Sequence, residues 1–288
     1  DEFSFDKPPP DFEPASMYTH STDAGWISRS HRAISPFRLV RPGTPEEAIE
    51  AFSNQADATF IAGGIDLVRR MRGGDKWNTV IDISSIDGLG AIEDAGDVVR
   101  IGALATHWDV ETSGVLAARL PDFQTAWMTI GNVRVRMAGT VGGNILAREA
   151  GYDGGVILGV LGAELVFASA DGEVCLPADS AGTEFPAGGL LKRVDIPVVP
   201  KRKLVFDRSL KPMVSAAVSV EGERHEVGIG CAFPEPIFRT GAGAVEAEEL
   251  SADLPEPTGN PMGSSAYRRR MVGVIAARAY RTLTGGMH

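Results

Sequence analysis

The chain has 288 residues, of which 43% are hydrophobic and 23% charged, and its formal net charge is −10 at pH 7. This is the composition of an ordinary globular protein, and the length suits two domains better than one core. The acidic balance argues against a nucleic-acid binder, which usually carries a basic domain. No apolar run approaches the ~20 residues of a membrane span, and the first ten residues lack the apolar core of a signal peptide. We therefore predict a cytoplasmic protein without a membrane span.

A metal site within this chain is not expected. Cys175 and Cys231 are the only cysteines, too few for an iron–sulfur cluster, which takes about four thiolates. We expect both to be buried as small hydrophobic residues rather than joined in a disulfide or redox pair. The five histidines show no ligand spacing such as His-x-x-x-His.

Residues 1–34 differ from the rest of the chain. They contain three consecutive prolines and six acidic residues and show no apolar periodicity. Such a segment cannot bury enough surface to offset the entropy lost on ordering. We predict an extended arm that is either disordered or laid on a partner.

The first regular elements lead into a glycine pair. Thr44-Pro45-Glu46-Glu47 has the threonine, proline and glutamate of a capped helix start and predicts a helix over 45–53. A short buried strand over 58–62 follows and ends at Gly63-Gly64, and Asp66 then stands at the start of a second helix. A strand, a glycine turn and a helix start form a common anion-binding arrangement, although an ordinary turn between strand and helix has the same pattern.

The middle of the chain alternates strands and helices before a second glycine pair. Residues 131–139 show no clear helical period and lead into the stretch Thr140-Val141-Gly142-Gly143-Asn144. Further on, Asp171-Gly172 between two short apolar segments predicts a hairpin. The other predicted elements are strands at 79–83 and 98–103, and helices at 106–112, 115–130 with an interruption at Pro121, and 154–161.

The two glycine pairs share one pattern, because each follows an apolar run and the pairs are about 80 positions apart. Glycine lets the backbone take positive φ and approach a bulky anion closely. Successive N–H groups in such turns form a concave donor surface that suits phosphate. One pair would carry little weight in a chain with 34 glycines, but two can converge on one pyrophosphate group.

From about residue 183 the pattern changes to strands separated by turns such as Glu221-Gly222, which is typical of an antiparallel sheet. An acidic stretch at 246–256 is loop or helix. The closing helix at 265–283 has five arginines and no acidic residue, which favours a solvent- or subunit-facing surface over an anion site. The predicted strands lie at 190–198, 204–208, 214–220 and 226–232.

Familiar catalytic motifs are absent from the sequence. It contains no Gly-x-Ser-x-Gly nucleophile turn and no phosphate loop ending in Gly-Lys-Ser/Thr. Gly228-Ile229-Gly230 lacks the third glycine of a dinucleotide-binding fingerprint. Two phosphate-binding turns without an acid, base or nucleophile set indicate that a bound cofactor supplies the chemistry.

Three groups of residues stand out together: Ala62-Gly63-Gly64-Ile65-Asp66-Leu67, then Ile130-Gly131-Asn132 with Arg134, Arg136 and Thr140-Val141-Gly142-Gly143-Asn144, and finally Tyr267-Arg268-Arg269. Together they resemble the FAD-binding medium subunit of molybdenum hydroxylases, the xanthine dehydrogenase and carbon monoxide dehydrogenase family. The resemblance runs from about residue 35 to the C-terminus. It implies an α+β fold with a two-subdomain FAD-binding domain of the vanillyl-alcohol oxidase type over 35–182. A small C-terminal domain with a three-stranded antiparallel sheet and helices follows over 183–288.

By this resemblance the two glycine stretches hold the FAD pyrophosphate and ribityl chain, Asp153 contacts the cofactor, and Ile130 and Leu191 stand at apolar flavin-contact positions. From the residues alone, Ile130 and Leu191 fit core packing equally well, and Asp153 also fits a helix N-cap before Gly154. The full set of candidate cofactor-binding residues is Ile61, Ala62, Gly63, Gly64, Ile65, Asp66, Ile130, Thr140, Val141, Gly142, Gly143, Asn144, Asp153 and Leu191.

Three segments depart from the family pattern. Ile65 stands where the family usually has Thr, His or Asn, so one side-chain hydrogen bond near the phosphates is missing. Residues 148–152, with the sequence Arg-Glu-Ala-Gly-Tyr, replace a stretch that often contains Asp-Pro or Ser-Pro. Residues 208–213 are shorter than usual and lack an arginine-rich turn and an aromatic residue.

The resemblance implies an electron-transfer subunit with no catalytic residue of its own toward the organic substrate. FAD in this chain would accept electrons from two [2Fe-2S] clusters of a small partner subunit and pass them to an external acceptor. A large partner subunit would carry the molybdenum-pterin cofactor, in a heterotrimer or a dimer of heterotrimers. Two alternatives remain open: a self-contained flavin oxidase of the vanillyl-alcohol type, which needs its own substrate pocket and general base, and a structural subunit that has lost FAD.

Overall fold

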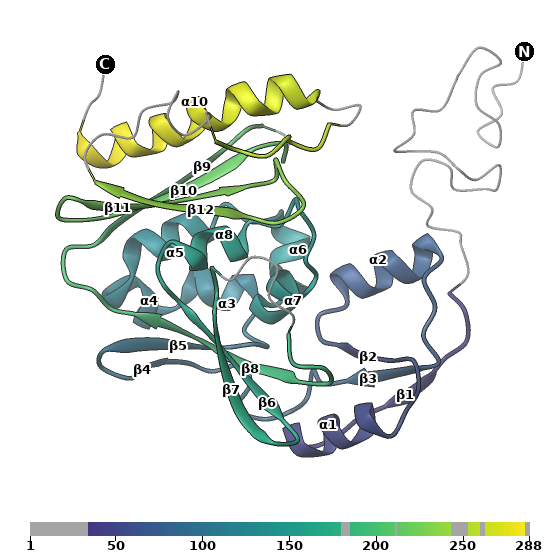
Figure 1. Cartoon of the computed structure of the whole chain (residues 1–288). Helices are drawn as coiled ribbons and strands as arrows, with labels where there is room; N and C mark the ends of the chain where they lie inside the picture. Colours follow the sequence, from purple (N-terminus) through teal and green to yellow (C-terminus); the bar gives the residue numbers. More distant parts are fainter. Residues whose placement is uncertain (1–33, 180–184, 211, 243–252, 260–262, 286–288) are drawn as a thin grey trace, which may run out of the picture.

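The computed structural model of the chain describes residues 34–179, 185–210, 212–242, 253–259 and 263–285. Apart from Ile34, the predicted N-terminal arm lies outside these ranges, as does most of the acidic stretch at 246–256. Figure 1 shows three sheets with helices packed on them and between them. None of the helices in these ranges combines the length and the apolar character needed to cross a membrane.

The first unit is a small parallel sheet with two helices. Its strands lie in the order β1-β3-β2. The predicted cap at Thr44 is confirmed, because its Oγ1 accepts a hydrogen bond from the Glu47 N–H at 3.2 Å and the Glu47 carboxylate accepts one from the Gly43 N–H at 2.7 Å. The elements of this unit are β1 (Arg38–Val40), α1 (Pro45–Ser53), β2 (Ala58–Ile61), α2 (Ile65–Gly73) and β3 (Thr79–Asp82).

The second unit is an antiparallel sheet, in the order β4-β5-β8-β6-β7, packed against short helices. Phe123, Trp127 and Phe167 are among the largest fully buried side chains of its core. The predicted hairpin at Asp171-Gly172 is confirmed between β6 and β7. The strands are β4 (Ile92–Asp94), β5 (Val98–Gly102), β6 (Glu164–Ser169), β7 (Gly172–Pro177) and β8 (Leu190–Pro197). The helices are α3 (His107–Thr112), α4 (Gly114–Arg119), α5 (Pro121–Trp127), α6 (Val133–Ala138), α7 (Val141–Leu146) and α8 (Gly154–Gly159).

Two helical predictions in this unit need correction. In the predicted helix over 115–130 the interruption at Pro121 is confirmed, because Pro121 opens α5 at its first position, where a missing N–H costs nothing. The correction there is the end of the helix, which lies at Trp127 and not at residue 130. The stretch 131–139, which shows no helical period, contains α6. Its start is capped by Asn132, whose side chain accepts from the N–H groups of Arg134 and Val135. A helix of six residues is too short to display a period, so its cap is the only local signal.

Strand β8 belongs to this second sheet and not to the C-terminal one. The segment 190–198 is predicted with the strands that follow it, yet Leu190–Pro197 pairs antiparallel with β5 on one side and β6 on the other. That grouping is therefore wrong. Consecutive strands usually neighbour one another, but a strand joins whichever sheet edge the folded chain offers it. The pairing places β8 in one sheet with strands that precede residue 183.

The third unit is an antiparallel sheet covered on one face by the long helix α10 (Ser265–Thr284) (Figure 1). Helices α5 and α8 of the second unit contact the same sheet and join the two units. Within the described residues this sheet has four strands, one more than the resemblance implies, in the order β12-β11-β10-β9. The strands are β9 (Lys203–Arg208), β10 (Ser215–Glu221), β11 (Arg224–Gly230) and β12 (Ile237–Ala242).

Helix α10 uses some of its arginines inside the protein. Arg268 is only 3% exposed, and its guanidinium donates to the carbonyl oxygens of Met213 at 3.1 Å and Cys231 at 2.7 Å. Arg278 pairs with Asp207 on β9. The expected solvent- or subunit-facing surface is therefore wrong for Arg268, which ties the loops after β9 and β11 to the helix.

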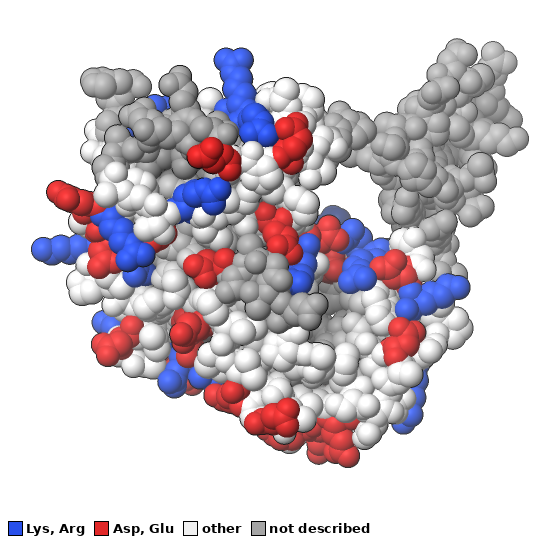
Figure 2. Space-filling model, viewed as in Figure 1, with Lys and Arg blue, Asp and Glu red and all other residues white. Residues whose placement is uncertain are grey.

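The two cysteines differ in exposure. Both are free thiols, and Cys231 is buried as expected, but Cys175 is exposed. Cys175 lies on β7 at the edge of the second sheet, so a small hydrophobic residue there has no second layer to cover it. On the face drawn in Figure 2, acidic and basic side chains are interspersed.

Candidate cofactor-binding site

A cavity of about 560 Å³ opens where the first and second units meet. Every candidate residue lines it except Val141, which is fully buried in the core of the second unit. The space-filling view is hollowed in this region, between α2 and the central helices (Figure 2). The candidate residues in the wall are Ile61, Ala62, Gly63, Gly64, Ile65, Asp66, Ile130, Thr140, Gly142, Gly143, Asn144, Asp153 and Leu191.

The two glycine stretches meet at one side of this cavity. A Cβ atom placed on Gly63 would lie 1.6 Å from the carbonyl oxygen of Ala138, two residues before the second stretch. A Cβ atom on Gly142 would lie 2.9 Å from the carbonyl oxygen of Ala103. Both positions therefore require glycine for close backbone contact, and the two stretches lie together at one cavity. Their convergence on one pyrophosphate stays a prediction.

The first stretch presents free backbone donors. Gly64 is the N-cap of α2 with a φ of 72°, and it makes no side-chain cap. The N–H groups of Gly64, Ile65 and Asp66 donate no hydrogen bond to any of the described residues. A helix start with unpaired N–H groups carries partial positive charge and binds anions. This end of the cavity is thus suited to a diphosphate.

The second stretch differs, because its backbone donors are already used. It forms the start of α7, with Thr140 as the N-cap. The prediction that both stretches offer N–H groups to a phosphate is therefore wrong for the second one. The bonds in question run from Val141 to the Ala105 carbonyl (2.9 Å), from Gly142 to the Ala103 carbonyl (2.8 Å), from Gly143 to Thr140 Oγ1 (3.1 Å) and from Asn144 to the Thr140 carbonyl (3.0 Å).

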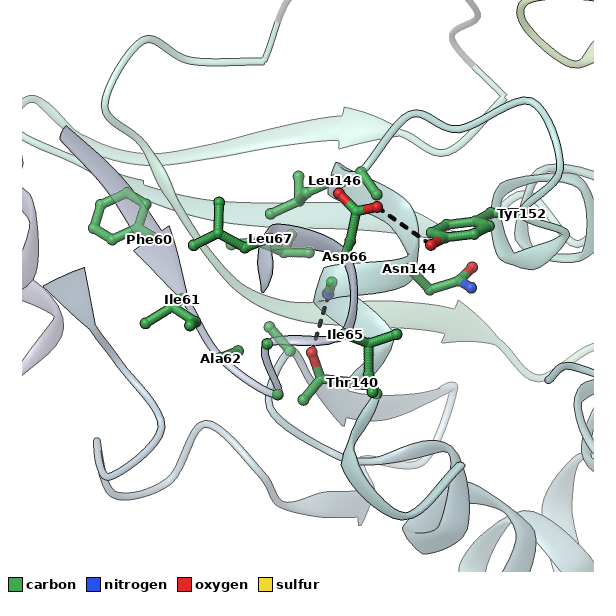
Figure 3. A pocket seen from close by; sticks show the side chains of 18 of the residues that line it. Phe60, Ile61, Ala62, Ile65, Asp66, Leu67, Thr140, Asn144, Leu146 and Tyr152 are labelled. Atoms are coloured by element: carbon green, nitrogen blue, oxygen red, sulfur yellow. Dashed lines mark hydrogen bonds between the residues drawn. The ribbon is translucent and has the colours of Figure 1, made fainter. Parts of the chain in front are cut away.

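What remains available at the second stretch is side-chain chemistry. Thr140 Oγ1 accepts from Gly143, so its hydroxyl hydrogen is free to donate. Asn144 Oδ1 accepts from the Gly154 N–H at 3.0 Å, which leaves the amide NH₂ group without a partner among the described residues. Figure 3 shows Thr140 and Asn144 beside Ile65 and Asp66 of α2. Donors from both stretches therefore face the same space.

Asp153 is buried, with 2% of its surface exposed, and it forms an ion pair rather than a cap. It occupies the N-cap position of α8 but makes no capping hydrogen bond with its side chain. Its carboxylate accepts from Arg208 Nη1 at 3.1 Å and lies 3.4 Å from the Cys231 sulfur. The pKa of Cys231 is raised to about 12 by burial and by the Asp153 charge, so the thiol stays protonated.

Arg208 was not predicted from the sequence. It lies at the end of β9, lines the cavity, and also donates to the Thr129 carbonyl oxygen at 2.9 Å. Its pairing with Asp153 joins residues 55 positions apart in the chain, so no local pattern could reveal it. Together the two residues place one fixed positive and one fixed negative charge at this wall.

Ile130 and Leu191 belong to the core of the second unit and also line the cavity. They are 5% and 1% exposed. Core packing and an apolar contact surface for a ligand are therefore not alternatives at these positions.

Arg136 organises the wall that contains Ile130. It is 6% exposed, and its guanidinium forms an ion pair with Glu111 at 2.7 Å. The remaining donors bind the loop that precedes Gly131 and the start of α3, which fixes this wall in place. The accepting carbonyl oxygens belong to Trp127 (3.1 Å), Met128 (3.1 Å), Ile130 (2.8 Å) and His107 (3.0 Å).

His107 is a further cavity residue that the sequence did not single out. It is 2% exposed, its ring packs on Trp127 at 5.6 Å between centroids, and its Nδ1 has no partner among the described residues. Burial, helped by the positive charge of Arg136, lowers the pKa of His107 to about 4. The ring is therefore neutral at physiological pH. A Cβ atom on Gly139 would lie 3.1 Å from this ring, so a glycine is needed there as well.

The cavity has two further features that sequence reasoning missed. Phe52 and Phe60 stack at 5.0 Å between ring centroids and form part of its apolar wall. Tyr152 lines the opposite rim and donates to Asp66. Aromatic residues scattered over three segments give no pattern in the sequence.

These observations fit FAD. The free N–H groups of α2 suit its diphosphate, the glycines remove the side chains that would fill the cradle, and buried apolar residues suit a planar ring. The Thr140 hydroxyl and Asn144 amide add donors beside the same space. Nothing in the donor set calls for a different group.

Comparison with known proteins identifies a matching family and several relatives. Residues 35–199 match the family model described as the FAD binding domain in molybdopterin dehydrogenase. The glyceraldehyde dehydrogenase medium chain of Sulfolobus acidocaldarius is 24% identical over 85% of this chain and 97% of that protein. The nicotine 6-hydroxylase medium subunit of Paenarthrobacter nicotinovorans is 31% identical over 51% of this chain and 52% of that protein.

A solved structure shares the fold. Carbon monoxide dehydrogenase from Hydrogenophaga pseudoflava superposes with a TM-score of 0.82 and 22% identity, over 88% of this chain and 99% of the matching chain. The resemblance inferred from the glycine stretches is confirmed by the family match, which covers more than half of the chain. The chain belongs to the family of FAD-binding domains of molybdopterin dehydrogenases, and it is an oxidoreductase subunit.

Proposed function

We propose that this chain is the FAD-carrying electron-transfer subunit of a molybdenum hydroxylase complex. The observation that carries the proposal is the meeting of the free N–H groups of Gly64, Ile65 and Asp66 with the Thr140–Asn144 stretch in one cavity, inside the region of the family match. When bound there, FAD takes up electrons from the iron–sulfur clusters of a partner subunit and passes them to an external acceptor.

The residues of this chain bind and position the cofactor. The N–H groups of Gly64, Ile65 and Asp66 hold the diphosphate, and the Thr140 hydroxyl and the Asn144 amide donate beside it. Ile130 and Leu191 exclude water from the flavin ring, since both are buried in the cavity wall. The Asp153–Arg208 pair would supply fixed charges in the wall of the cavity, and these would influence the reduction potential of the bound cofactor.

The proposed partners follow from the family and from the names of the relatives. Two relatives are a medium chain and a medium subunit, which implies larger and smaller chains in the same assemblies. For this chain we infer a large subunit with a molybdenum-pterin cofactor and a small subunit with two [2Fe-2S] clusters. The assembly is a heterotrimer or a dimer of heterotrimers, in the cytoplasm.

Reconstitution with the partner chains tests this proposal. The purified chain is expected to bind FAD and to show the visible absorption of a flavin, and substrates of the complex are expected to bleach it only when both partner subunits are present. Bleaching by an organic substrate without partners would overturn the proposal in favour of a self-contained flavin oxidase. Failure to bind FAD would overturn it in favour of a structural subunit.

A further inference from the structure

The segment 148–152, which joins α7 to α8, passes along the rim of the cavity. Gly151 and Tyr152 line the cavity from this segment, and Ile65 and Asp66 line it from the start of α2. The two sides are about 80 residues apart in the sequence. We refer to residues 148–152 as the strap. The strap and the start of α2 therefore line the same cavity.

Two interactions join the strap to α2. The Tyr152 hydroxyl donates to Asp66 Oδ1 at 3.3 Å (Figure 3). Arg69 Nη2 donates to Glu149 Oε1 and to Asp66 Oδ1, both at 2.5 Å. Asp66, Arg69, Glu149 and Tyr152 therefore form one cluster that bridges the rim. We call these four residues the latch.

The latch also determines what Asp66 does at the helix start. An acidic side chain in the first turn of a helix ordinarily interacts with the free N–H groups there. In this protein the Asp66 carboxylate accepts instead from Arg69 and Tyr152. The N–H groups of Gly64, Ile65 and Asp66 thus remain available, and the positive charge of Arg69 offsets the repulsion between a carboxylate and a diphosphate.

The donors of the latch keep their protons at physiological pH. Burial and the Asp66 carboxylate raise the pKa of Tyr152, so its phenol remains a hydrogen-bond donor. The pKa of Arg69 is raised by Asp66 and Glu149, although burial acts in the opposite direction. The Arg69–Glu149 bond is the weaker link of the latch in salt, because the two side chains are 54% and 42% exposed.

A contact at the other end of the strap restricts its movement. The Arg148 guanidinium lies over the Phe185 ring at 4.4 Å, and Arg148 itself has a φ of 50°. A residue with a side chain rarely takes this conformation unless surrounding contacts hold it. The strap is therefore positioned by contacts at both of its ends, and the latch is the part that crosses the rim.

We propose that the latch closes the cavity over the diphosphate of the bound dinucleotide and sets the rate at which the cofactor leaves. Asp66 then touches the cofactor through its backbone N–H alone, and its side chain acts as a positioning group, as do Arg69, Glu149 and Tyr152. This inference rests on the proposed binding of FAD, and it assigns a role to the segment in which the sequence departs from its family.

The test is the rate of FAD release from the holoprotein, measured by flavin fluorescence after mixing with an excess of a competing FAD-binding apoprotein. Tyr152→Phe removes one hydrogen bond, and Glu149→Gln removes the negative charge that pairs with Arg69 while keeping an oxygen that can accept. Each is expected to speed release about three- to tenfold. The double variant is expected to release FAD faster than either single variant. The rate of FAD binding is expected to change less, because binding precedes closure. Added salt is expected to speed release from the wild type but not from Glu149→Gln.

Arg72→Gln is the matched control, because it removes an exposed arginine of the same helix that makes no ion pair with the described residues. Unchanged release from Tyr152→Phe and Glu149→Gln, with FAD bound, would overturn the latch and leave the proposed function standing. Equal acceleration by Arg72→Gln would also overturn it, since release would then respond to a substitution on α2 outside the latch. A wild-type protein that binds no FAD would instead overturn the proposed function. Thermal unfolding of each apoprotein checks that the variants are folded.

Discussion

The two glycine stretches look alike in the sequence but have different physical roles. At Gly63-Gly64 the chain leaves a strand and starts a helix whose first N–H groups stay unpaired. At Gly142-Gly143 the corresponding N–H groups bind Ala103 and Thr140, and the glycine serves to bring two backbones together. The comparison teaches that a glycine pair marks a place of close approach, while the neighbouring elements decide whether a ligand or the protein itself is approached.

The largest effect on the first glycine stretch is expected from the substitution Gly63→Ala. The new Cβ atom would lie 1.6 Å from the Ala138 carbonyl oxygen, and this clash with backbone cannot be relieved by a side-chain rotation. We expect loss of FAD binding and a decrease of about 3 kcal/mol or more in the free energy of unfolding. FAD titration and denaturant unfolding measure the two effects.

Gly155→Ala serves as the control for that substitution, because a Cβ atom there meets nothing within 4 Å. It is expected to bind FAD normally and to be as stable as the wild type or slightly more so, since Ala favours a helix over Gly. Normal FAD affinity in Gly63→Ala would show that the two stretches need not touch.

The second largest effect concerns His107, which packs behind Gly139 and so supports the second stretch. The pKa of His107 is about 4 in the folded protein, against a reference value of 6.5. Between these two pH values the unfolded chain binds a proton at this residue that the folded protein excludes. This stabilisation is complete above pH 6.5 and is lost as the pH falls toward 4. The difference between the two pKa values corresponds to about 3 kcal/mol in the free energy of unfolding.

The variant His107→Gln removes this titration. Denaturant unfolding of wild type and variant across the same pH range is expected to show a steeper loss of stability in the wild type. Parallel curves for the two proteins would contradict a neutral, buried His107.

The third prediction separates the two stretches directly. In Gly142→Ala the new Cβ atom would lie 2.9 Å from the Ala103 carbonyl oxygen and 3.0 Å from the Ala103 Cβ, which displaces a contact inside the protein. We expect the apoprotein to lose about 1–3 kcal/mol of stability. The FAD affinity of folded Gly142→Ala is expected to fall less than that of Gly63→Ala. The role assigned to Gly142 would be contradicted if the substitution weakened the free energy of FAD binding more than the free energy of unfolding.

The smallest expected effect concerns the side chain of Thr140. Thr140→Ala removes the N-cap of α7 and leaves the Gly143 N–H without its partner, which costs about 1 kcal/mol. The same change removes a donor to the cofactor, whereas Thr140→Ser keeps both functions. We expect thermal unfolding of the serine variant to match the wild type and FAD to bind more weakly only to the alanine variant. Equal FAD affinity in all three proteins would exclude the Thr140 hydroxyl from cofactor binding.

Local sequence determined the features that depend on neighbours in the chain. The cap at Thr44, the hairpin at Asp171-Gly172 and the glycine turn before α2 each follow from backbone preferences of a few consecutive residues. The second glycine stretch borders the same cavity as the first. The candidate residues suggested by the family resemblance line that cavity, with the exception of Val141.

Tertiary structure decided which partners the polar groups and strands found. The membership of β8 in the second sheet, the burial of Arg268 and the pairing of Arg208 with Asp153 all join segments far apart in the chain. The hydrogen bonds from the second stretch to the carbonyl oxygens of Ala103 and Ala105 also join separate segments of the chain. A hydrogen-bond donor looks the same in the sequence whether it is free or paired, because its partner is set by the three-dimensional approach of another segment.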